Sequence, residues 1–73
     1  MYKFSKERMI KRIKEEGRVD MLTDDVIEIM DNLDGCEASN SCWRRTVFNE
    51  PVCWVIGKDG TGAYVNERDC IWG

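Results

Sequence analysis

The 73-residue chain contains no histidine, only one proline and no long hydrophobic run. Without histidine, the Ser/His/Asp and Cys/His arrangements that activate a catalytic nucleophile are excluded. A pair of carboxylates can act as acid and base, but so small a domain has little room for a cleft that buries a sugar. No stretch approaches the ~18 apolar residues that span a bilayer, and the N-terminus offers no apolar signal region. We therefore expect a cytoplasmic protein that is not an enzyme.

The four cysteines have spacings that do not resemble a zinc site. They are Cys36, Cys42, Cys53 and Cys70. Structural zinc sites usually take their ligands as close pairs about two to four residues apart, and no such pair exists here. In a reducing cytoplasm we expect four free thiols and no metal or other cofactor. A zinc-stabilised mini-domain with all four cysteines as ligands is kept as an alternative, because four thiolates suffice for a closed tetrahedral site.

Two amphipathic helices are predicted in the N-terminal half, over residues 6–16 and 24–33, where apolar residues recur with a spacing of three to four. Capping residues agree at all four ends: Ser5 and Thr23 before the helices, Gly17 and Gly35 after them. Residues 36–43 show no periodicity and are predicted to form a loop.

The C-terminal half has the alternation of β-strands. We predict strands over residues 44–48, 52–57 and 63–66, with Asp59-Gly60 as a hairpin turn. The central strand is apolar on both sides, and Trp54 is expected to anchor the core. The tail, residues 67–73, is expected to form a helical turn that returns Ile71 and Trp72 to the core. Residues 1–73 are thus predicted to form a single α+β domain, with two N-terminal helices followed by a three-stranded antiparallel β-meander.

Charge is distributed unevenly along the chain. Residues 1–18 carry seven basic and three acidic side chains, whereas residues 19–43 carry seven acidic and no basic ones. In the second helix Asp24, Glu28 and Asp31 fall on one face, and Asp34 and Glu37 extend this acidic row. A solvated, solubilising face is the structural alternative. As a function, the acidic row predicts a protein partner with a basic surface, such as a nuclease or another nucleic-acid-binding protein.

A second candidate site combines one aromatic and two basic residues: Trp43, Arg44 and Arg45. Such a cluster can stack on bases, and the basic first helix can approach phosphates. This pattern predicts a small nucleic-acid-binding regulatory module as the alternative function. The net charge of −3 argues against direct nucleic-acid binding. A membrane partner is not expected.

The chain also has a family resemblance, which covers most of its length. It is carried by Ser41-Cys42-Trp43-Arg44-Arg45, by Glu50-Pro51-Val52-Cys53-Trp54-Val55-Ile56-Gly57 and by Ala63-Tyr64-Val65-Asn66. In length and general residue pattern, the chain with these stretches resembles small uncharacterised proteins of phages and mobile elements of Gram-positive bacteria, anti-CRISPR-like inhibitors among them. The resemblance implies a host-directed inhibitor and transfers no functional residue. Together with the acidic row, it leads us to hypothesise a non-enzymatic protein-interaction module that inhibits a basic nucleic-acid-handling host protein.

Overall fold

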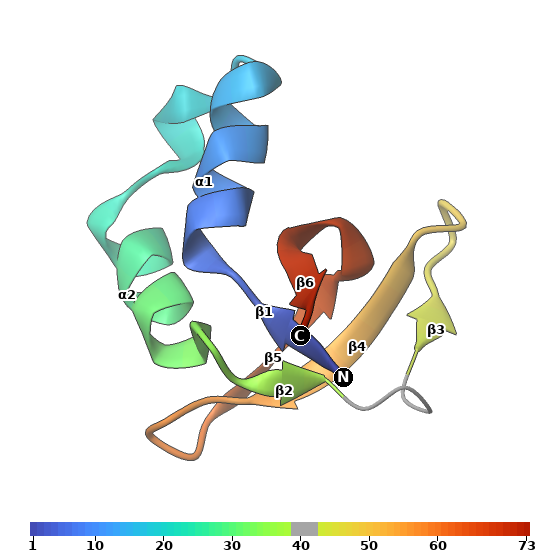
Figure 1. Ribbon diagram of the computed structural model, residues 1–73. Helices are drawn as coiled ribbons and strands as arrows, with labels where there is room; N and C mark the ends of the chain where they lie inside the picture. The colour runs from blue at the N-terminus through green and yellow to red at the C-terminus, as the bar shows by residue number, and fades with distance from the viewer. Residues whose placement is uncertain (39–42) are drawn as a thin grey trace.

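The computed structural model describes residues 1–38 and 43–73. Two helices lie to one side of two small antiparallel sheets, and the two ends of the chain lie close together (Figure 1). The helices are α1 (Lys6–Glu15) and α2 (Asp24–Leu33), with two short 3-10 helices, η1 (Val19–Met21) and η2 (Glu67–Asp69). The strands are β1 (Tyr2–Phe4), β2 (Glu37–Ala38), β3 (Arg44–Arg45), β4 (Pro51–Ile56), β5 (Gly62–Asn66) and β6 (Cys70–Trp72).

Local capping determines where the two helices begin and end. The hydroxyl of Ser5 accepts a hydrogen bond from the Arg8 N–H at 3.2 Å, and that of Thr23 accepts from the Val26 N–H at 3.3 Å. Gly17 and Gly35 follow the helices with positive φ angles of 72° and 78°. Both predicted helices are confirmed, and α1 ends one residue earlier than expected.

The prediction of a single meander is wrong in part. The described strands form two sheets of three strands each, ordered β2-β1-β6 and β3-β4-β5. β1 precedes the helices, and part of the predicted loop, Glu37–Ala38, pairs with it as β2. Residues 39–42 of that loop lie outside the described residues. Strands of two or three residues are too short to show alternation, and the first sheet therefore has no signature in the sequence.

The β4–β5 hairpin is longer and better specified. Its Asp59-Gly60 turn is confirmed: Gly60 has a φ of 89°, and its N–H donates to the Gly57 carbonyl at 3.1 Å. The predicted strand over residues 44–48 contains only Arg44–Arg45, since the chain turns at Asn49, whose N–H donates to the Thr46 carbonyl. The hairpin tip is fastened to α2, because Asn32 accepts from the Asp59 N–H at 2.9 Å.

The main core lies between the two sheets and α2. Its buried members are Phe4, Met30, Leu33, Ala38, Cys53, Val55, Val65 and Cys70. Trp54 is not among them, and its predicted role as core anchor is wrong. Cys53 and Val55 point inward, which turns Trp54 outward. The tail does contain a helical turn, η2, but Ile71 and Trp72 are exposed in β6, contrary to prediction, and only Cys70 is buried there.

Candidate interaction surfaces

The acidic row of α2 is partly used inside the molecule. Asp31 forms an ion pair with the Lys6 ammonium at 2.5 Å, and Asp34 accepts a hydrogen bond from the Lys6 backbone N–H at 2.9 Å. Asp24 and Glu28 are exposed, with no ion pair to any residue in the described part of the chain. The row that faces solvent without a basic partner is therefore shorter than the sequence suggests.

The remaining predicted site residues do not form one cluster. Glu37 lies opposite Lys3 in the antiparallel register of β1 and β2, so it lies on a different element from the acidic row. Trp43 is half-buried and makes an edge-to-face contact with Tyr2, with ring centroids 5.4 Å apart. Arg44 and Arg45 are exposed in β3, and the Arg45 guanidinium donates to the Asn49 carbonyl at 3.0 Å. Because its ring already packs on Tyr2, Trp43 is poorly placed to stack on a base beside the two arginines.

The surface that the sequence analysis missed is the outer face of the β3-β4-β5 sheet. We define this outer face as Arg44, Val52, Trp54, Ile56 and Tyr64, which the strand register places on one side. Trp54, Ile56 and Tyr64 are 50%, 56% and 58% exposed. At the adjoining β3–β4 turn, Val47 and Phe48 are 94% and 84% exposed. The pattern of apolar residues on both sides of β4 was visible in the sequence, but not which side is open.

The rings on this outer face have fixed positions. Trp54 and Tyr64 are cross-strand partners in edge-to-face contact, with centroids 5.0 Å apart. The Trp54 indole lies over Gly62, where an added Cβ would come within 2.6 Å of the ring. Glycine at position 62 therefore allows the indole to lie against the strand. Beside Tyr64 and Val52, the surface is hollowed by a cavity of about 300 Å³ that Arg44 also lines.

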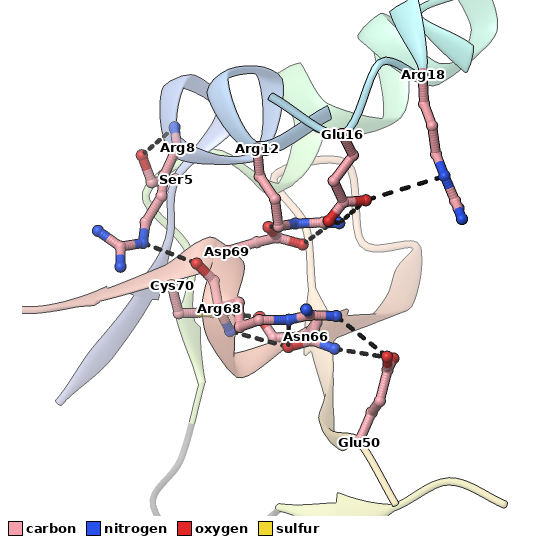
Figure 2. Close-up of polar contacts among 10 residues, drawn as sticks. All are labelled: Ser5, Arg8, Arg12, Glu16, Arg18, Glu50, Asn66, Arg68, Asp69 and Cys70. Carbon is pink, nitrogen blue, oxygen red and sulfur yellow. Dashed lines mark hydrogen bonds and ion pairs between the residues drawn. The ribbon is translucent and has the colours of Figure 1, made fainter. Parts of the chain in front are cut away.

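A charged network joins α1 to the C-terminal segment (Figure 2). The Arg12 guanidinium donates to both carboxylate oxygens of Asp69, at 2.6 and 3.0 Å, and also contacts Glu16 at 3.1 Å. Asp69 is only 2% exposed. The hydrogen bonds that Arg12 donates to Asp69 raise the pKa of Arg12 and hold its guanidinium in the charged form. Around it, Arg8 donates to the Arg68 carbonyl at 2.7 Å, and Arg68 pairs with Glu50 at 3.1 Å. This network fixes the position of η2 relative to α1.

Next to this network, a groove lies between the helices and the free edge of β5, and Arg12, Arg68 and Asp69 of the network line it. Its cavity has a volume of about 600 Å³. The helix wall includes Met9, Val26 and Ile29, and the sheet wall is residues 63–66. The lining also includes three arginines and three acidic residues: Arg12, Arg18, Arg68, Glu16, Glu50 and Asp69. The groove thus combines an apolar interior with charged walls.

The cysteines are not all free, contrary to expectation. Cys53 is disulfide-bonded, whereas Cys36 and Cys70 are free thiols that donate to the Asn32 and Asn66 carbonyls. The expectation of free thiols came from an assumed reducing compartment and took no account of where the sulfurs lie. Cys42 lies outside the described residues. Within the described ranges, no three potential ligands among His, Cys, Asp and Glu gather into a metal site.

Alkylation without reductant is expected to distinguish these cysteines. Burial raises the pKa of Cys70 to about 11, and the neighbouring carboxylates add to this effect. Less thiolate is then present at neutral pH, so iodoacetamide should modify Cys36 of the folded protein well before Cys70. Cys53 should react only after reduction. Peptide mapping by mass spectrometry measures each site, and labelling of Cys53 in unreduced, unfolded protein would contradict the disulfide.

Comparison with known proteins supplies no family for this chain. No protein-family model, curated protein or solved structure matches it. In the part of the chain that the structure describes, no helix is both long and apolar enough to cross a membrane.

Proposed function

We propose that the protein is a non-enzymatic protein-interaction module that binds its partner through the outer face. The observation that supports this most strongly is the row of half-exposed Trp54, Ile56 and Tyr64 on one sheet face. Contiguous exposed apolar side chains often mark binding sites. Trp, Tyr and Arg are the residue types enriched in binding hot spots, and Arg44 lies at the border of this row.

The composition of the outer face favours a protein over nucleic acid. Val52 and Ile56 contribute aliphatic surface, which suits burial against apolar side chains rather than stacking on bases. The rings of Trp54 and Tyr64 meet at 74° and do not form a flat platform. The chain as a whole carries a net charge of −3, which disfavours contact with phosphates. A protein partner is therefore the better match.

A second candidate function uses α2. Asp24 and Glu28 are exposed one helical turn apart, with no ion pair to a described residue, and Asp25 lies beside them. These carboxylates would complement a basic groove and accelerate association with it. The target would be a basic nucleic-acid-handling host protein, and the activity that of a phage-type, anti-CRISPR-like inhibitor.

Three double variants separate these possibilities. Trp54→Ser with Ile56→Ser alters the outer face, and Asp24→Lys with Glu28→Lys alters α2. Val19→Ser with Met21→Ser is the matched control, since both side chains are exposed and apolar but lie in η1. Each tagged protein is used to capture partners from a lysate of the source cells, with quantification by mass spectrometry. We expect the outer-face variant to lose its partner at least about tenfold, as for removal of a hot-spot residue, and the control to retain it.

Other outcomes of these experiments favour one of the two alternative functions or contradict the proposal. Loss of the partner only in the α2 variant supports the inhibitor with an acidic contact surface. A random-sequence single-stranded oligonucleotide tests the nucleic-acid alternative by fluorescence anisotropy. If the parent protein binds it and Arg44→Ala with Arg45→Ala abolishes binding, the module recognises nucleic acid instead. Equal capture by all variants contradicts the proposed function.

A further inference from the structure

The free edge of β5 forms one side of the groove. β5 is the last strand in the order β3-β4-β5, so one of its edges is not paired. The bond from the Gly57 N–H to the Thr61 carbonyl, at 2.7 Å, marks a hydrogen-bonded pair in the β4–β5 hairpin. Since such pairs alternate along antiparallel strands, Ala63 and Val65 bond to β4. Gly62 and Tyr64 therefore turn their backbone N–H and C=O groups toward the unpaired edge.

These outward N–H and C=O groups make no hydrogen bond within the part of the chain that the structure describes. No hydrogen bond joins the backbone of Gly62 or Tyr64 at this edge to another described residue. An unpaired edge is a template for a further strand. The groove beside it provides the space, and half-exposed Ile29 on the facing helix provides apolar contact for side chains of an added strand.

The charges around the groove cancel in pairs. Arg12 pairs with Asp69, Arg68 with Glu50, and Glu16 lies between Arg12 and Arg18 at 3.1 and 4.0 Å. A ligand of either charge would have to compete with these pairs and lose its hydration. An uncharged chain with apolar side chains avoids both costs.

We propose that this groove binds an extended, uncharged segment of a partner protein, which adds to β5 as a new strand. The backbone of Gly62 and Tyr64 would hydrogen-bond to the segment, and its apolar side chains would pack on Ile29 and Val26. Asn32 and the Arg12–Asp69 pair hold the two walls of the groove in place. This site lies on a different side of β5 from most of the outer face, and the two share Val52 and Tyr64 at their border.

The probe is a phage-displayed library of linear twelve-residue peptides, selected against the whole protein. We expect enriched sequences with apolar residues at alternate positions and no charge between them. In NMR titrations with a selected synthetic peptide, the amide signals of Gly62 and Tyr64 should shift, and the Tyr64 amide should exchange more slowly. Ile29→Lys should weaken binding at least about tenfold, whereas the control Ile56→Lys, on the outer face, should leave it unchanged.

N-methylation of the peptide tests the strand pairing itself. Two sets of peptides are compared, each methylated at every second amide but offset by one position. In one set the methylated amides are those that face β5, so the donors to β5 are lost. In the other set the methylated amides face away, and the donors to β5 remain. Strand addition predicts that one set loses binding and the other retains it. The proposal is overturned if methylation has equal effects in the two sets, if Ile56→Lys loses binding, or if no peptide is enriched. A dimer of this chain in solution in which the β5 edges are paired would also overturn it. None of these results depends on the outer face binding its own partner.

Discussion

Replacing Met30 by alanine is expected to lower the free energy of unfolding by about 2–5 kcal/mol. Met30 is almost completely buried in the core cluster with Phe4, Leu33 and Val55. The shorter side chain loses its apolar contacts and leaves a cavity that the two sheets can close only partly. A domain of this size has only ~3–5 kcal/mol of net stability from its core. Chemical denaturation followed by circular dichroism should therefore find a much lower denaturation midpoint for the variant than for the parent protein.

Trp54→Ala is the matched comparison for that experiment, because it removes an even larger apolar side chain from a strand that borders the core. Trp54 is half-exposed and packs mainly on Tyr64 and over Gly62. An aromatic pair of this kind contributes ~0.5–1.5 kcal/mol beyond its buried area, so the loss should be clearly smaller than that for Met30. Equal losses in the two variants would contradict the outward orientation of Trp54.

The parts of the fold that could be predicted from sequence are those specified by neighbouring residues. Ser5 and Thr23 begin the helices, and Gly60 permits the hairpin turn, because each acts on atoms within a few positions of itself. Spacing then identified the inward side of the helices. These features need no knowledge of what lies across the core.

The sheets required information that short patterns do not contain. β1 pairs with β2 and β6, which lie more than 30 and 60 positions away and are two and three residues long. In β4 both sides are apolar, so alternation does not say whether Trp54 or Val55 faces the core. That ambiguity hid the outer face, because Trp54 at its centre was assigned to the interior.

For the acidic row, the sequence showed which residues carry the charge but not which residues of the same chain bind them. Asp24, Glu28 and Asp31 do lie in the predicted helix. No local pattern indicates that Lys6 reaches both Asp31 and Asp34, 25 and 28 positions away. Tertiary structure therefore reduces the charge that this face can offer to another protein.

Arg12→Met is expected to lower the free energy of unfolding by about 3 kcal/mol, at the lower end of the range for a broken buried ion pair. The carboxylate of Asp69 would stay buried, 2% exposed, without the bidentate guanidinium that now compensates its lost hydration. The lower end applies because a quarter of the Arg12 side chain is accessible to water. Urea denaturation at neutral pH measures the loss.

Two further variants separate the cost of an orphaned charge from the loss of packing. Arg12→Met combined with Asp69→Leu removes both charges and should recover much of the lost stability, since apolar replacements of buried pairs are often tolerated. Arg68→Met is the control: its pair with Glu50 is about half exposed, and such surface pairs contribute less than about 1 kcal/mol. If Arg12→Met costs no more than Arg68→Met, Asp69 is hydrated in solution and the Arg12–Asp69 pair does not fasten α1 to η2.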